Sequence, residues 1–141
     1  MRAERFYRGV FLAAAVYNIT WGTIMVVFPD SIFRMAGLPP LDYPFLVSGI
    51  GMMVAVYGYG YWVISREPRR YPQLAVLGVM GKAFGAIGWI ANVVADVVPA
   101  QTLWVPLFND AIWLPPFIAY LFWFRAQRAK SSLVGNRLYS A

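Results

Sequence analysis

Four long apolar stretches dominate the sequence, at residues 9–28, 45–64, 74–98 and 103–124. Each can supply the roughly 20 helical residues that cross the hydrocarbon core of a bilayer. Only 13% of the 141 residues are charged, whereas an ordinary soluble domain carries about 25%. We therefore predict an all-α membrane protein with one domain over residues 1–124, a four-transmembrane-helix bundle, followed by a basic cytoplasmic tail at 125–141.

The positive charges indicate how this bundle crosses the membrane. They gather before the first stretch, between the second and third, and after the fourth, as Arg2, Arg5, Arg8, Arg66, Arg69, Arg70, Arg125, Arg128, Lys130 and Arg137. Short loops rich in arginine and lysine face the cytoplasm, so we expect both termini there, in a multi-pass protein of the bacterial inner membrane. The net charge of +6 follows from this topology, and we expect no nucleic-acid partner.

A short helix is predicted after the first span. Asp30 precedes the segment SIFRMAG and suits an N-cap, while Gly37 suits the position just beyond a helix end. We expect this helix to lie on the outer membrane surface. The tail beyond residue 130, SSLVGNRLYSA, is polar and weakly patterned, which favours a mobile or surface-associated segment.

The chain contains neither cysteine nor histidine. This composition excludes disulfides, thiolate metal sites, the usual haem ligand and the histidine clusters of di-iron enzymes. We therefore predict no cofactor and no metal site.

Glycines recur on one face of the third stretch, at Gly78, Gly81, Gly85 and Gly88. Such small residues let another membrane helix approach closely. The second stretch, which we expect to be its antiparallel neighbour, offers a matching surface in which Gly58 and other glycines alternate with tyrosines. One interpretation is tight helix packing, and the other is that the glycines leave room for a flat ligand or a lipid tail.

Lys82 stands beside this stripe, about 13 Å into a core roughly 30 Å thick. An unpaired ammonium at that depth costs several kcal/mol, so it needs a partner. Asp110, near the outer end of the fourth stretch, is the obvious one, and a lysine side chain reaching outward can meet it. We predict a buried ion pair between Lys82 and Asp110, either structural or at the centre of a functional pocket.

Other polar and aromatic residues fall at comparable depths and complete the predicted pocket. Pro115 and Pro116 interrupt the fourth stretch just beyond Asp110, which frees backbone carbonyl groups. Broken helices beside a buried charge are frequent at membrane binding sites. The remaining candidates for this pocket are Asn109, Asn18, Tyr17, Trp21 and Trp113.

Four segments together, YNITWG, VYGYGY, GKAFGAIG and NDAIWLPPF, resemble a group of small four-helix bacterial membrane proteins that is broadly DoxX-like. The resemblance extends from about Tyr17 to Phe117 and implies the fold and the membrane location. DoxX-like proteins are associated with quinone-linked sulfur oxidation and membrane redox complexes, but no redox centre is evident in this sequence.

Three functions stay open at this stage. The first is a binding or accessory protein whose pocket holds a lipid, a quinone-like molecule or another amphiphile, or docks a partner membrane protein. The second is a small proton-coupled transporter working as a homodimer or larger oligomer, with Asp110 as the titrating carboxylate. The third is an enzyme on a lipophilic substrate, with Asp110 as general acid or base. The small size favours the first, and an enzyme is the less expected outcome.

Overall fold

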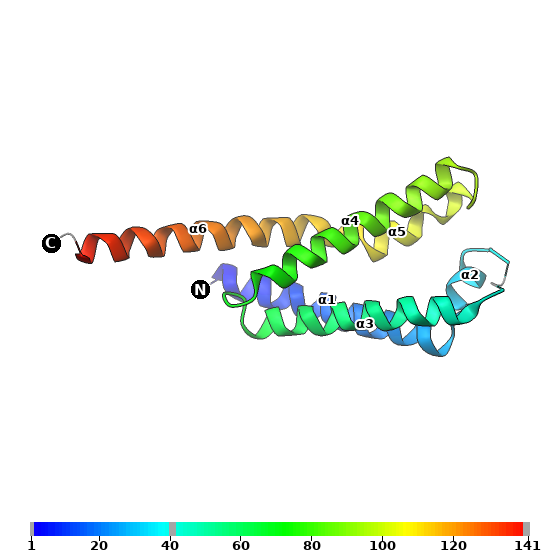
Figure 1. Cartoon of the computed structure of the whole chain (residues 1–141), viewed down its shortest axis with the longest axis horizontal. Coiled ribbons are helices and arrows are strands. Elements are labelled where there is room, and N and C mark those ends of the chain that lie inside the picture. The colour runs from blue at the N-terminus through cyan, green and yellow to red at the C-terminus, as the bar shows by residue number, and fades with distance from the viewer. Residues whose placement is uncertain (1, 40–41, 140–141) are drawn as a thin grey trace.

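The computed structural model describes residues 2–39 and 42–139, the side chains of 132–139 excepted, and its regular structure there is entirely helical (Figure 1). The elements are α1 (Arg2–Val27), α2 (Ser31–Met35), α3 (Pro44–Arg66), α4 (Pro72–Val94), η1 (Ala100–Leu103), α5 (Trp104–Asn109), η2 (Ala111–Trp113) and α6 (Leu114–Tyr139). Four segments of the described residues are long and apolar enough to cross a membrane: α1, α3, α4 and the interrupted Ala100–Ser131.

Most of the apolar surface of these four segments points away from the protein. Only 17–33% of each apolar window is buried within the chain, and large side chains such as Phe45, Val56 and Phe84 are more than 60% exposed. A soluble fold does not leave so much contiguous apolar surface in water. The four expected membrane helices are thus present, and lipid is the solvent that suits them.

Two helix pairs build the bundle, α1 with α3 and α4 with α6 (Figure 1). Glycines allow the closest approach in the first pair: a Cβ on Gly58 would lie 2.9 Å from the backbone nitrogen of Ile19, and one on Gly22 would lie 2.5 Å from the carbonyl oxygen of Gly51. As predicted, the glycines of the third span face the second span, because Gly78 and Gly81 lie against tyrosines of α3. The predicted place of Gly58 in that contact is wrong. The glycines of α3 pack on α1, and α3 meets α4 through tyrosine rings.

An aromatic core joins the two pairs near one end. Phe11 stacks on Phe117 with ring centroids 4.7 Å apart, and Tyr61 meets Phe117 edge-on at 4.9 Å. Tyr120 completes the cluster and donates a 2.6 Å hydrogen bond to the carbonyl oxygen of Pro68 in the α3–α4 loop. This loop, the start of α1 and the end of α6 lie at the same end of the molecule, here called the basic end because its arginines are Arg2, Arg5, Arg8, Arg66, Arg69, Arg70, Arg125 and Arg128.

The third membrane helix is shorter than the predicted span at 74–98, because it ends at Val94. Asp96 adopts a φ of 55°, and the amides of Asp96 and Val97 bond back to the carbonyls of Val93 and Asn92. This is the hydrogen-bond pattern of a Schellman motif, which terminates a helix. The same motif ends α2, where Gly37 has a φ of 70°. The predicted short helix is therefore present, although the Asp30 side chain makes no capping hydrogen bond.

The tail is helical over its described residues, because α6 continues without interruption to Tyr139. Its predicted association with the membrane surface stays a prediction. Its segment RAQRAKSSL contains mostly residues of good helix propensity. Residues 140–141 and the side chain of Arg137 lie outside the described part of the chain. The placement of the basic end in the cytoplasm stays a prediction from the charge pattern.

The contact between α1 and α3 can be tested with two glycines of the same helix. Gly58→Ala places a Cβ 2.7 Å from Ile19 Cγ1 and 3.1 Å from the carbonyl oxygen of Ala15, so we expect a loss of about 1–3 kcal/mol in the free energy of unfolding. Gly60→Ala is the control, because its Cβ meets nothing within 4 Å. Denaturant titration followed by circular dichroism measures both. Equal effects of the two substitutions would contradict the packing described.

Candidate functional site

The fourth membrane segment is broken at Asp110. Helix α5 ends at Asn109, Asp110 has φ −125° and ψ −58°, and α6 begins at Leu114 after the short η2 turn. Pro115 and Pro116 occupy the first turn of α6, where a missing N–H group costs nothing. The interruption predicted from these prolines is present, but it lies at Asp110 itself rather than beyond it. The broken backbone leaves the carbonyl group of Asn109 without its usual helical partner.

Lys82 fills the gap left by this break. It extends from α4 and is 5% exposed, and Asp110 is 7% exposed. The Lys82 ammonium donates a 2.5 Å hydrogen bond to the carbonyl oxygen of Asn109 and lies 3.4 Å from Asp110 Oδ1. Asn109 Nδ2 also donates to Asp110 Oδ1, at 3.0 Å. The two predicted partners therefore do meet, and a backbone carbonyl contributes the shorter contact.

Gly85 makes room for the carboxylate. A Cβ at this position would lie 2.9 Å from Asp110 Oδ2, so any side chain would displace the acid or the helix. Gly78 and Gly81 instead accommodate the rings of Tyr61 and Tyr57 of α3, and Gly88 has nothing within 4 Å of its Cβ position. The predicted stripe thus divides into two packing glycines, one glycine at the ion pair and one open glycine.

Two adjoining cavities lie between the helix pairs at the ion pair. The first, of about 210 Å³, is lined by Lys82 and Asp110 together with Asn18, Tyr57, Tyr61 and Gly81. The second, of about 270 Å³, is more apolar and is lined by side chains from α1, α2, α3, α4 and α5, among them Trp21, Met25, Phe33, Val47, Trp89 and Val105. Both cavities are lined by Ile50, Val54, Gly85, Asn109 and Asp110. We call the two together the groove.

Two amide oxygens beside the ion pair make no hydrogen bond among the described residues, Asn18 Oδ1 and Asn109 Oδ1. Asn18 is 2% exposed, and its Nδ2 donates a long 3.5 Å bond to the carbonyl oxygen of Val54. Because Val54 O and Asp110 Oδ1 only accept, both amide NH₂ groups must face them. The free atoms in the walls of the groove are therefore hydrogen-bond acceptors, and a buried acceptor without a donor is costly.

Not all of the predicted pocket residues line the groove. Tyr17 and Trp113 instead pack against each other, with ring centroids 5.5 Å apart, and Trp113 continues toward Phe117 of the aromatic core. Trp21 lies in the wall of the apolar cavity, as expected. Sequence reasoning missed Val54 and Ile50, which line both cavities, and the contribution of α2 through Ile32 and Phe33.

No known protein family, curated protein or solved structure matches this chain. The resemblance to DoxX-like proteins is therefore a prediction that these comparisons do not support. We therefore infer the function from the described residues that line the groove. Among those residues, no group of three or more carboxylate or other metal-binding side chains gathers at one point.

The interdependence of Lys82 and Asp110 can be measured with a double-mutant cycle. Lys82→Met or Asp110→Leu alone leaves one buried charge uncompensated, and we expect each to lower the free energy of unfolding by about 3 kcal/mol or more. The double substitution removes both charges, so it should cost less than the sum of the singles. Denaturant titration of the detergent-purified variants measures the cycle. Additive losses would mean that the two side chains act independently.

Proposed function

We propose that this protein is an integral membrane binding protein whose groove holds an amphiphilic molecule. The head group of that molecule would lie at Lys82 and Asp110, and its apolar part would lie against Trp21, Met25 and Val47. Lipids and quinone-like molecules have this general construction. We also propose that the protein lies in the bacterial inner membrane with its basic end in the cytoplasm, because its arginines gather at that end.

The observation that carries this proposal is the junction of the two cavities at the ion pair. A purely structural ion pair is best enclosed on all sides, because water or lipid beside it weakens the interaction or leaves polar atoms unpaired. Here both cavities are lined by Asp110 and both are mainly apolar, but the first is also lined by Lys82 and Asn18 and has the larger polar share. An amphiphile matches that gradient, since one end needs polar partners and the other does not.

The unpaired acceptors favour one kind of head group. Asn18 Oδ1 and Asn109 Oδ1 need donors, and Asp110 also accepts. A hydroxyl-bearing head, such as that of a glycerolipid or a quinol, supplies donors, whereas a quinone carries only acceptors. We therefore infer that hydroxyl-bearing amphiphiles bind in preference to their oxidised or alkylated counterparts.

The binding proposal can be tested by native mass spectrometry of the detergent-purified protein, with analysis of the small molecules that co-purify. We expect a defined amphiphile on the wild type and its loss from the Lys82→Met/Asp110→Leu variant. Gly85→Leu should also lose it, because the new side chain enters both cavities and presses on Asp110. Gly88→Leu should retain it, since that position is open.

Two outcomes would contradict the proposal. Equal occupancy of the Gly85→Leu and Gly88→Leu variants would mean that the bound molecule lies elsewhere on the protein. Absence of any small molecule from the wild type, combined with co-purification of a second membrane protein, would instead identify the groove face as a protein-docking site.

A further inference from the structure

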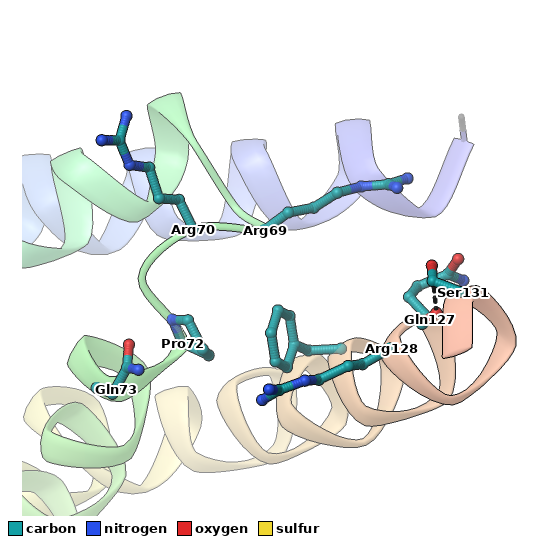
Figure 2. A pocket seen from close by; sticks show the side chains of 8 residues that line it. Arg69, Arg70, Pro72, Gln73, Gln127, Arg128 and Ser131 are labelled. Atoms are coloured by element: carbon teal, nitrogen blue, oxygen red, sulfur yellow. Dashed lines mark hydrogen bonds between the residues drawn. The ribbon is translucent and has the colours of Figure 1, made fainter. Parts of the chain in front are cut away.

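A second hollow lies at the basic end, separated from the groove by the aromatic core. It has a volume of about 360 Å³ and lies between the α3–α4 loop, the start of α4 and residues 124–131 of α6 (Figure 2). Arg69 and Arg70 line it from the loop, where their side chains point in opposite directions, and Arg128 extends along α6 toward the start of α4. We call this hollow the arginine pocket. Its full lining is Arg69, Arg70, Pro72, Gln73, Phe124, Gln127, Arg128 and Ser131.

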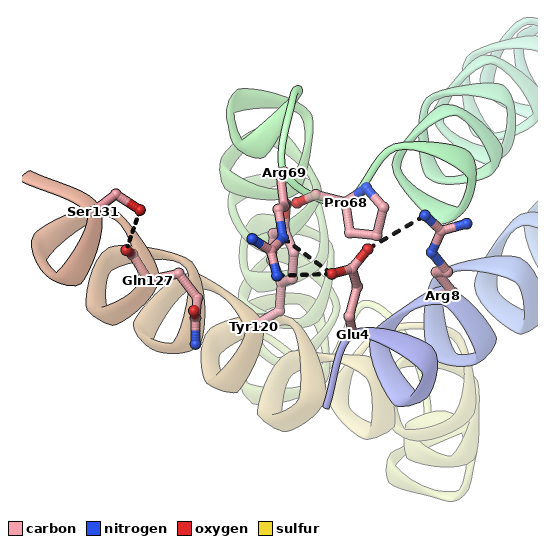
Figure 3. Close-up of polar contacts among 7 residues, drawn as sticks. All are labelled: Glu4, Arg8, Pro68, Arg69, Tyr120, Gln127 and Ser131. Atoms are coloured by element: carbon pink, nitrogen blue, oxygen red, sulfur yellow. Dashed lines mark hydrogen bonds and ion pairs between the residues drawn. The ribbon is translucent and has the colours of Figure 1, made fainter. Parts of the chain in front are cut away.

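The three arginines differ in how their charges are balanced. Arg69 pairs with Glu4 at 2.9 Å (Figure 3), and Arg70 pairs with Glu67 at 3.1 Å. The hydrogen bond to Glu67 raises the pKa of Arg70 above its usual value, so this guanidinium stays charged. Arg128 makes no ion pair among the described side chains, and no acidic side chain lines the pocket. Glu4 also pairs with Arg8, at 3.3 Å, so two arginines share its single negative charge. The wall of the pocket therefore carries a net positive charge, to which Arg128 contributes without an ionic partner among the described side chains.

The pocket combines that charge with features of a membrane interface. Phe124 and Pro72 supply apolar lining, and Gln73, Gln127 and Ser131 supply polar groups. One turn further along α4 from Gln73, Val76 and Leu77 are 44% and 50% exposed and begin the lipid-facing surface. A molecule in the pocket thus has polar partners on one side and the apolar membrane surface on the other.

We propose that the arginine pocket binds the head group of an anionic phospholipid. A phosphodiester carries one negative charge, which the Arg128 guanidinium can balance, and guanidinium groups bind phosphate oxygens with good geometry. Basic pockets between membrane helices on the cytoplasmic side are suited to such heads. A glycerol head group, as in phosphatidylglycerol, adds hydroxyls for the glutamines and for Ser131, whereas a zwitterionic head brings its own cation against the arginines.

Arg128 and Arg125 allow a matched test, because both lie on α6 and both are exposed, yet only Arg128 lines the pocket. Native mass spectrometry would compare the binding of dioleoyl phosphatidylglycerol and dioleoyl phosphatidylcholine to the full chain. We expect wild type to prefer phosphatidylglycerol, and Arg128→Gln to reduce that preference about fivefold, the effect of one interfacial arginine. Arg125→Gln should leave the preference unchanged. Both side chains are exposed and lie outside the core, so we expect neither substitution to affect folding.

Three results would overturn this assignment. One is a wild type that binds the two lipids equally. Another is an equal loss of preference in the two arginine variants, which would mean that diffuse positive charge attracts the lipid. The third is displacement of phosphatidylglycerol by an equimolar amount of glycerol 3-phosphate, which would identify the ligand as a soluble phosphate. The Gly85→Leu variant should keep its lipid preference, so this pocket can fail or succeed independently of the groove.

Discussion

The charge of Lys82 in a lipid solvent is the constraint on which the structure around the groove depends. With no water to solvate it, the ammonium must be satisfied from within the protein. Asp110 supplies the opposite charge, and the break in the fourth segment supplies the carbonyl oxygen of Asn109. Gly85 then has to be small, because the carboxylate occupies the space of its side chain. The interruption of the helix would otherwise leave the carbonyl group of Asn109 unpaired. Lys82 donates to that carbonyl and so stabilises the interruption, while the interruption supplies Lys82 with an acceptor.

Glycine has two different roles in this bundle. Between α1 and α3, Gly22, Gly51 and Gly58 remove side chains so that two backbones touch, and packing contacts of this kind hold helices together where lipid tails are as apolar as the helices themselves. On α4, Gly78 and Gly81 instead accommodate the tyrosine rings of α3. Rings keep the two helices further apart than a backbone contact does. The α4–α6 pair consequently separates from the α1–α3 pair beyond the aromatic core, and the groove lies in that separation.

The contrast between Lys82 and Gly58 shows what the sequence could and could not predict. Depth along a helix follows from 1.5 Å per residue, so the meeting of Lys82 with Asp110 was predictable from position alone. Which neighbour a helix face meets does not follow from its periodicity, and the glycines of α3 were therefore assigned to the wrong partner. The position of the helix interruption depends on the backbone angles of Asp110. The nearby prolines indicate that position only approximately. The helical form of the tail follows from the helix propensity of RAQRAKSSL, which its polarity does not reveal.

The aromatic core joins the two helix pairs at one end only, and this makes it a pivot. A small rotation of one pair about Phe11, Tyr61, Phe117 and Tyr120 changes the spacing at the far end most, because displacement grows with distance from the axis. Helical backbone hydrogen bonds lie within each segment, so such a rotation leaves them intact. The widest excursion falls beside α2, whose Ile32 and Phe33 contribute to the cavity wall. We therefore expect the lateral pressure and thickness of the surrounding bilayer to act most on the spacing of the two helix pairs beside α2.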